Sequence, residues 1–282
     1  MDTSGIRENV SRAYAHAVTA EDGSGCCASR PKGRLARRAG YTKEELAAIP
    51  QDAATNSFGC GNPLAFSQVG EGEVVLDLGC GAGIDMVLAA KKVGSAGRVI
   101  GVDMTDEMIE RGRRNLADAG LTNAEIRKGI IEELPVESGS VDWVISNCVI
   151  NLSPEKRRVF QEIARVLKRG GRMIVSDVIA EGLPPPVLAD LRLYSCCVAG
   201  ALSEGAYRDG LREAGMTNIV VHKTVEMNVG LLDELIESDR VAGDAGCDGG
   251  FDGQAPASDH RKALARACEG KVWSARISAR KP

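Results

Sequence analysis

Aromatic side chains are scarce in this chain: Phe, Trp and Tyr together make up 4% of its 282 residues. Proteins that bind single-stranded nucleic acids stack bases on such rings and carry basic grooves. Here Lys and Arg number 35 against 39 Asp and Glu, which gives a formal net charge of -4. We therefore expect no nucleic-acid partner.

Long hydrophobic runs and histidines are also lacking. No window approaches the roughly 18–20 apolar residues of a membrane span, and residues 1–10 are polar, without the apolar core of a secretion signal. We therefore expect no membrane partner and a cytoplasmic protein. His16, His222 and His260 are the three histidines, and none lies in a motif typical of a general base.

Cysteine, in contrast, is plentiful. The chain carries nine, an odd number in a protein of this size and without a secretion signal. A disulfide scaffold is typical of small secreted domains and does not fit this pattern. Metal or metalloid ligation, or redox chemistry, fits it better.

Strand and helix patterns alternate over the middle of the chain. This alternation predicts an α/β fold with a doubly wound, mostly parallel sheet. The predicted strands are 74–78, 98–102, 124–128, 141–146 and 172–178. The predicted helices are 84–92, 106–119 and one from Ser153, as N-cap, to a stop at Gly170-Gly171.

The flanking segments are less regular. Residues 8–17 are compatible with a helix, and Thr42 and Glu45 fit a capping box at the start of another. After the three prolines at 184–186 the patterns predict further helices and strands, with a Gly- and Asp-rich loop at 243–258. The predicted helices there are 187–198, 204–214 and 259–268, and the strands are 218–227 and 271–280.

A glycine-rich turn follows the first strand. Gly79, Gly81 and Gly83 are spaced as G-x-G-x-G, with Cys80 inside the turn, whereas a dinucleotide fingerprint needs its third glycine one residue later. Asp77 precedes the turn, where its carboxylate can accept hydrogen bonds from an ammonium group or balance a sulfonium. The segment therefore favours S-adenosylmethionine (SAM) as cofactor.

Two further segments extend this cofactor site. Asp103 ends the second strand and is placed to bind ribose hydroxyls, with Met104 beside it to pack on adenine. Ile131 and Glu132 lie in a segment that resembles the adenine border of class I methyltransferases. Asn147, at the end of the fourth strand, either faces the cofactor or is a turn-forming asparagine; the sequence leaves both open.

Three cysteines come from separate segments that this topology can bring over one cleft. Cys148 follows the fourth strand, Cys60 lies in a loop before the first, and Cys197 comes after the fifth. Three thiolates together would form a thiophilic site. Taken singly, each of these three cysteines could instead be a buried small hydrophobic residue. We interpret Cys80 in that way, and we interpret Cys247 and Cys268 as residues without a role in the site.

The contexts of these cysteines resemble the arsenite SAM methyltransferase family over about residues 7–226. The segments that carry the resemblance are Phe58-Gly59-Cys60-Gly61-Asn62-Pro63, Ser146-Asn147-Cys148-Val149 with Asn151-Leu152-Ser153, and Cys197-Val198-Ala199-Gly200-Ala201-Leu202. The resemblance implies a three-cysteine site for trivalent arsenic at Cys60, Cys148 and Cys197. Cys26 and Cys27 resemble an auxiliary N-terminal pair of that family.

That family methylates arsenite with SAM, and its turnover needs a thiol reductant such as thioredoxin or glutathione. The resemblance thus implies arsenic detoxification, with the arsenic lone pair attacking the methyl group without a general base. We interpret Cys60 as the ligand displaced first. How far methylation proceeds stays open. Two alternatives remain: a methyltransferase for an organic, quinone-like acceptor, and a metalloid-binding protein without turnover.

The resemblance also implies a division of the chain. Residues 1–63 are interpreted as a cysteine-containing extension that contributes to the arsenic site, and residues 64–182 as the Rossmann-like core that binds SAM. Residues 183–240 would supply the arsenic-binding segment and complete the sheet. Residues 241–282 form a small α+β region together with the preceding segment, and their role cannot be assigned from the sequence.

Overall fold

The computed structural model describes residues 3–19, 36, 39–232 and 258–282. Cys26, Cys27, Cys247 and all but the last residue of the 243–258 segment lie outside the described residues. Within the described part, no helix is long and apolar enough to cross a membrane.

A seven-stranded sheet forms the centre of the molecule, in the order β3-β2-β1-β4-β5-β7-β6. The five strands from β3 to β5 run parallel, β7 is antiparallel to β5, and β6 is antiparallel to β7. The expected doubly wound, mostly parallel sheet is confirmed. The strands are β1 (Val74–Leu78), β2 (Arg98–Asp103), β3 (Ala124–Lys128), β4 (Val141–Asn147), β5 (Leu167–Ala180), β6 (Thr217–Glu226) and β7 (Val272–Arg280).

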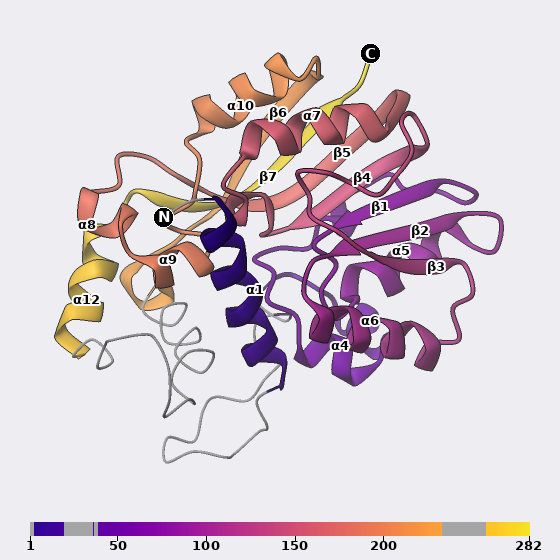
Figure 1. The fold of residues 1–282 in the computed structure, drawn as a ribbon, viewed down its shortest axis with the longest axis horizontal. Helices are drawn as coiled ribbons and strands as arrows, with labels where there is room; N and C mark the ends of the chain where they lie inside the picture. Colours follow the sequence, from indigo (N-terminus) through magenta and orange to yellow (C-terminus); the bar gives the residue numbers. More distant parts are fainter. Residues whose placement is uncertain (1–2, 20–35, 37–38, 233–257) are drawn as a thin grey trace.

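Helices cover both faces of the sheet (Figure 1). They are α1 (Thr3–Thr19), α3 (Lys43–Ala47), α4 (Gln51–Thr55), α5 (Ile84–Val93), α6 (Asp106–Asp118), α7 (Lys156–Val166), α8 (Pro185–Leu188), α9 (Leu191–Ser195), α10 (Glu204–Glu213) and α12 (Ser258–Ala267), with single 3₁₀ turns at Leu64–Phe66 and Ile150–Leu152. Thr42 caps α3 with the expected capping box, since its side chain accepts from Glu45 N at 3.1 Å.

Alternating side chains along the strands build two cores. Leu76 and Leu78 of β1 pack with α7 and α10 on one face, whereas Val75 packs with α5 and α6 on the other. Because successive side chains of a strand point to opposite faces, each central strand contributes to both cores. The two cores hold the carboxyl ends of β1, β2 and β4 in fixed positions relative to one another.

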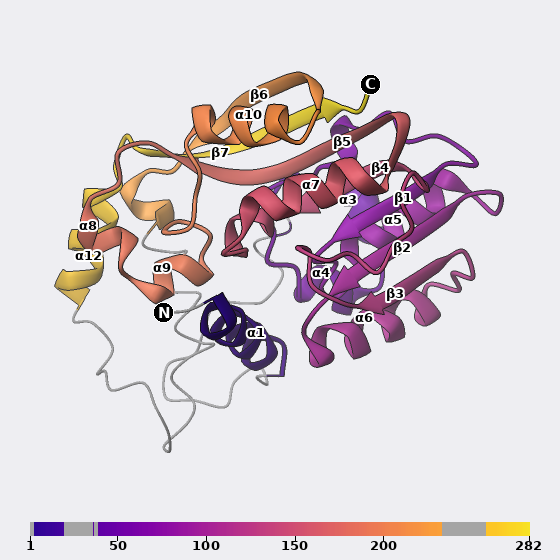
Figure 2. The same cartoon turned by 45° about the horizontal axis from the view of Figure 1, so that its top comes forward.

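A third apolar cluster lies beyond these strand ends. It contains Cys148 and Cys197 and residues of α1, α8 and α12, with Cys60 packed against it. Figure 2 shows α1, in indigo, lying alongside the sheet at this end, with α8, α9 and α12 gathered next to it. The cysteine-bearing segments are therefore assembled in an apolar environment adjoining the carboxyl edge of the sheet, where ligands bind in open α/β sheets.

Two boundaries differ from the sequence expectation. Helix α7 begins at Lys156 with Glu155 as N-cap, two residues after the predicted N-cap Ser153. The Ser153 hydroxyl accepts from Glu155 N at 3.0 Å and donates to Glu132 at 2.6 Å. The helix also ends at Val166, and Gly170 and Gly171 lie inside β5. A Cβ on Gly171 would approach Lys168 O to 2.8 Å, so these glycines mark a close approach at an irregularity of β5 rather than a helix stop.

The segment predicted as one helix over 187–198 forms two short ones, α8 and α9. The chain turns between them at Asp190, whose Oδ1 accepts a hydrogen bond from Leu193 N at 3.2 Å. In the C-terminal region, β7 inserts between β5 and β6 and pairs with both. This assigns residues 272–280 a structural role, because without them β6 would be separated from the sheet.

Two glycines of α10 provide a matched test of this packing. A Cβ at Gly210 would lie 2.6 Å from the Phe160 ring of α7, whereas at Gly205 the nearest atom is 4.0 Å away. We expect Gly210→Ala to lower the free energy of unfolding by about 1–3 kcal/mol through overpacking. Gly205→Ala should leave it unchanged or raise it by up to ~1 kcal/mol. Urea denaturation of both variants checks this, and equal effects would contradict the close contact between α7 and α10.

Candidate active site

The glycine-rich turn connects β1 to α5 in a conformation that requires glycine. Gly79, Gly81 and Gly83 all have positive φ, and a Cβ at Gly79 would lie 2.5 Å from the Val149 side chain. The second strand stabilises the turn, because Asp103 Oδ2 accepts from Gly81 N at 2.9 Å. The other oxygen, Oδ1, accepts from Thr105 N at 2.9 Å.

A pocket opens next to this turn, with about 970 Å³ of empty space, part of it open to solvent. This size is usual for sites that bind small molecules and cofactors. Of the residues predicted to bind the cofactor, all except Gly83 line it: Asp77, Gly79, Cys80, Gly81, Asp103, Met104, Ile131, Glu132 and Asn147. Gly83 instead forms the N-cap of α5.

Three buried carboxyl groups give the pocket its electrostatic character. Burial, and then the charges of Asp85 and Asp103, raise the pKa of Asp77 well above its usual value. Burial also raises the pKa of Asp85 from 3.8 to about 6, and it raises that of Asp103 although backbone hydrogen bonds act in the opposite direction. Acids held this close together favour a cationic ligand.

Asn147, at the end of β4, connects this pocket to the loop that carries Cys60. Its Oδ1 accepts from Gly61 N at 3.1 Å, and its Nδ2 donates to Gly61 O at 2.5 Å. The same Nδ2 lies 3.1 Å from the Tyr41 hydroxyl and 3.3 Å from Asp85 Oδ2. Tyr41 in turn donates to Asp85 Oδ1 at 2.8 Å.

Helix α1 borders the same pocket. Arg7, Val10 and Tyr14 are among the lining residues, and Arg7 Nε donates to the buried Glu132 at 3.2 Å. Arg7 also pairs with Glu155 at the start of α7. Because Arg7 and Ser153 both bind Glu132 Oε1, the predicted adenine-border carboxylate also anchors α1 to the core of the protein.

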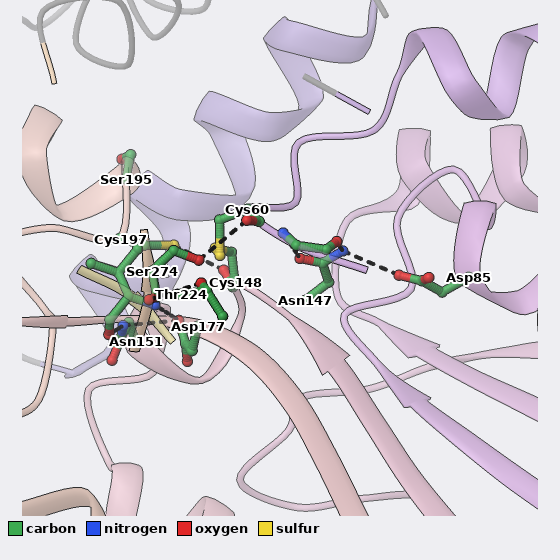
Figure 3. Close-up of a disulfide and its surroundings, with 12 residues drawn as sticks. Cys60, Asp85, Asn147, Cys148, Asn151, Asp177, Ser195, Cys197, Thr224 and Ser274 are labelled. Atoms are coloured by element: carbon green, nitrogen blue, oxygen red, sulfur yellow. Dashed lines mark hydrogen bonds between the residues drawn. A yellow bond between two sulfur atoms is a disulfide. The ribbon is translucent and has the colours of Figure 1, made fainter. Parts of the chain in front are cut away.

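The three predicted arsenic ligands lie close together, next to Asn147 (Figure 3). Cys60 and Cys148 form a disulfide, and the Cys197 thiol donates to Cys148 O at 2.8 Å. Cys148 also lines the cofactor pocket, whereas Cys60 and Cys197 are not among its lining residues. The sequence predicts three thiols here; the structure holds two of them in the oxidised form.

Cys148 and Cys197 share an uncommon backbone conformation, with φ of 60° and 63°. A residue with a side chain in this left-handed region costs of order 1–3 kcal/mol, and such strain persists only where the surroundings enforce it. At Cys148 a hydrogen bond from its N to Ser176 O, at 2.8 Å, contributes to that enforcement. The fold thus holds both cysteines in strained positions that direct their side chains into one cluster.

A buried carboxylate borders the cysteine cluster. One oxygen of Asp177 and the sulfurs of Cys148 and Cys197 all lie within 4.8 Å of one another. Burial raises the pKa of Asp177 to about 7, although it accepts hydrogen bonds from Val178 N and Asn151. Lys156 is nearby, and burial lowers its pKa while the charges of Asp177 and Cys197 oppose that shift.

The remaining described cysteines differ in their surroundings. Burial raises the pKa of Cys80 well above its usual value, and burial also raises that of Cys268. A thiol with a raised pKa is a poor nucleophile and a poor ligand at neutral pH. Both observations agree with the interpretation of Cys80 as a small packed residue and Cys268 as a bystander.

Sequence reasoning missed three residues of this region. Tyr41 lies in a segment without a motif, far from Asn147 in sequence, and nothing local connects the two. Asp85 looks like an ordinary acid in the first turn of a helix. Asp177 did carry a signal, because a carboxylate within the apolar strand 173–179 must be buried.

The comparison with known proteins agrees with this geometry. Residues 70–215 match the model of a family described as a methyltransferase domain, which is more than half of the chain. This chain belongs to the methyltransferase family. The methyltransferase is 46% identical to the arsenite methyltransferase of Halobacterium salinarum, over 70% of this chain and 50% of that protein. Mouse (Mus musculus) arsenite methyltransferase is 34% identical, over 71% of this chain and 55% of its own length.

Solved structures of methyltransferases are also similar to this chain. A crystal structure of an arsenic(III) SAM methyltransferase from Chlamydomonas reinhardtii has a TM-score of 0.62 and 32% identity, and it covers 89% of this chain and 74% of that one. The [4+2]-cyclase SpnF also has a TM-score of 0.62 but only 17% identity, which shows a shared fold alone. The predicted resemblance is confirmed, although the methyltransferase spans only about half the length of the curated relatives it matches.

The raised pKa of Asp85 predicts how stability changes with pH. Between about pH 4 and pH 6 the folded methyltransferase without cofactor keeps a proton on Asp85 that the unfolded chain has already released. Stability therefore falls as pH rises through this window. Asp85→Asn removes the titrating group and should flatten this part of the profile. Urea denaturation across the pH range measures it, and a profile parallel to that of the wild type would contradict the assignment.

Proposed function

We propose that this methyltransferase transfers methyl groups from SAM to trivalent arsenic, giving mono-, di- and trimethylated arsenicals in successive rounds, and that it serves arsenic detoxification. The observation that carries the proposal is the position of Cys148, which lines the cofactor pocket and is bonded to Cys60, with Cys197 hydrogen-bonded to its backbone. The named arsenite methyltransferases among its relatives support it.

The lining of the pocket suits SAM. When bound, SAM supplies a methyl group that its positively charged sulfonium activates for transfer. Asp77 and Asp85 present buried carboxylates, which match a ligand with sulfonium and ammonium charges. Asp103 ends β2, where acids bind ribose hydroxyls in related nucleotide sites, and Met104 beside it lines the same pocket.

The cysteine cluster suits the substrate. Trivalent arsenic is soft and three-coordinate, so thiolates are its preferred ligands. When Cys60, Cys148 and Cys197 are reduced, each thiol can replace one hydroxyl of arsenite, and its proton leaves with that hydroxyl as water. The apolar surroundings of the cluster exclude water that would compete for arsenic.

Methyl transfer then needs no base from this chain. Arsenic bound by three thiolates keeps a lone pair that can attack the methyl group once the two are held at short distance. Neither His16 nor His222 lines the pocket, in agreement with a reaction that moves no proton from the acceptor. Arsenic is formally oxidised from the trivalent to the pentavalent state in this step.

The Cys60–Cys148 pair is suited to return arsenic to the trivalent state. In the proposed order, Cys60 is the ligand lost first, and Cys148 and Cys197 hold arsenic through the transfer. The Cys60 thiolate then attacks the Cys148 sulfur; the S–S bond forms, the arsenic–sulfur bond breaks, and its electron pair stays on arsenic. Thioredoxin or glutathione would next reduce the disulfide, and Cys26 and Cys27, outside the described residues, are candidate auxiliary thiols.

A single reaction mixture tests the proposed activity. We expect the reduced protein, incubated with SAM, arsenite and a thiol, to form methylated arsenic species that can be separated and quantified over time. Release of S-adenosylhomocysteine should depend on arsenite. Tight binding of arsenite without methylation would favour a metalloid-binding protein, and neither binding nor turnover would favour an organic acceptor.

Cysteine variants test the assigned order of ligands. With excess small thiol present to reduce the pentavalent product in place of the Cys60–Cys148 pair, Cys60→Ser should slow the first methylation more than the second, because as a ligand Cys60 is already displaced when the second begins. Cys148→Ser and Cys197→Ser should abolish both steps, since each removes a ligand that is needed throughout. Cys247→Ser, at a cysteine interpreted as a bystander and outside the described residues, is the matched control and should retain activity. Equal loss of both steps in Cys60→Ser would refute the order.

A further inference from the structure

We propose that Tyr41 and Asp85 are positioning residues that couple the charge bound in the cofactor pocket to the placement of Cys60. The inference rests on the proposed function for its role in catalysis, but the coupling itself can be measured without arsenic. It starts from the loop Gly59–Gly61, where both backbone groups of Gly61 pair with the Asn147 side chain.

The Asn147 side chain forms hydrogen bonds with both backbone polar groups of Gly61 in this loop. It accepts from Gly61 N and donates to Gly61 O, so one planar amide pairs with both backbone groups of Gly61. Glycine at 59 permits this approach, because a Cβ there would lie 2.3 Å from the Asn147 amide. Since Cys148 follows Asn147 directly, the same turn of chain sets the position of both sulfurs of the disulfide.

The orientation of the Asn147 amide depends on two groups on its other side. Its Nδ2 contacts the Tyr41 hydroxyl and Asp85 Oδ2, and the Tyr41 hydroxyl donates to Asp85 Oδ1. Tyr41 and Asp85 are both buried, with 5% and 3% of their surface exposed. Three side chains therefore contact one another, and the Asn147 Nδ2 hydrogen that does not bond Gly61 O is shared between the Tyr41 hydroxyl and Asp85 Oδ2.

Asp85 also belongs to the cofactor pocket, where it adds to the negative charge around Asp77. Without a cation the two carboxylates repel each other. A bound sulfonium and ammonium would relieve this repulsion and lower the pKa of Asp85 from about 6, so that its remaining neutral fraction near neutral pH ionises and it accepts stronger hydrogen bonds. Tyr41 and Asn147 would then be held more firmly, and with them the Gly59–Gly61 loop.

The consequence for catalysis is an order of events. Cys60 reaches its position for ligation when the cofactor is bound, so arsenic is captured next to a methyl donor rather than in an empty site. After transfer the sulfonium charge is gone, the hold on the loop weakens, and Cys60 can move toward Cys148. In this role Tyr41 and Asp85 act through Asn147 and need no contact with arsenic.

Alkylation of Cys60 measures the coupling directly. The reduced full-length protein is treated with iodoacetamide, with and without saturating SAM or S-adenosylhomocysteine, and the labelled Cys60 peptide is quantified by mass spectrometry. We expect SAM to slow labelling of Cys60 by about threefold or more, the scale of one buried hydrogen bond, and S-adenosylhomocysteine to slow it less. Labelling of the fully buried Cys268 reports loss of the fold.

Two variants separate coupling from a structural role. Tyr41→Phe keeps the packed ring but removes the hydroxyl, so it should bind SAM within about threefold of wild type and yet lose the effect of SAM on Cys60. Asp85→Asn keeps the shape but not the charge, and should lose the difference between SAM and S-adenosylhomocysteine. Thr217→Val, which removes a hydroxyl of β6 that donates to Arg280 O and lies outside the pocket lining, is the control and should behave as wild type.

The outcomes distinguish this inference from the proposed function. The coupling is overturned if SAM leaves Cys60 labelling unchanged in the wild type, or if Tyr41→Phe keeps the full effect with Cys268 still protected. If SAM protects Cys60 through Tyr41 but no arsenic is methylated, the coupling stands and the proposed function fails. If arsenic is methylated but SAM does not protect Cys60, the proposed function stands and the coupling fails.

Discussion

The paired hydrogen bonds between the Asn147 amide and the Gly61 backbone are the contact on which the site depends. They fasten a loop from outside the sheet to the carboxyl end of β4, where the chain passes directly into Cys148. Besides these bonds, Cys60 is held by the disulfide, which a catalytic cycle must break, by a hydrogen bond from Ser274 to its carbonyl, and by packing against the third apolar cluster. The Asn147–Gly61 contact therefore adds to the disulfide in placing Cys60 beside Cys148.

Several features around this contact lower the stability of the folded protein. Cys148 and Cys197 adopt left-handed backbone conformations, and Asp77, Asp85 and Asp177 are buried carboxyl groups with raised pKa values. Such features concentrate where a site must be pre-organised for a ligand, since each lowers stability in its absence. The two extended cores on either face of the sheet supply the stability that tolerates them.

Most of the fold could be predicted because its signals are local. Strands such as 74–78, the glycine turn and Asp103 each follow from a short pattern whose physical reason lies in adjacent residues. The end of α7 could not be predicted in this way, because the two glycines are placed by distant segments: Gly171 lies against Asp142 of β4, and Gly170 N donates to Lys281 O after β7. The roles of Asp85 and Tyr41 could not be predicted for the same reason, because their partner Asn147 lies far away in the sequence. The cysteines could be selected from nine only through resemblance to a family, since spacing alone left each open to a packing role.

X-ray absorption spectroscopy at the arsenic edge tests the central claim, that three thiols from three segments form one site. The reduced protein loaded with one equivalent of arsenite should show three sulfur neighbours and no oxygen around arsenic. Cys60→Ser should show two sulfurs, with Cys148 and Cys197 still bound. Oxygen-dominated coordination in the reduced wild-type protein would contradict the account.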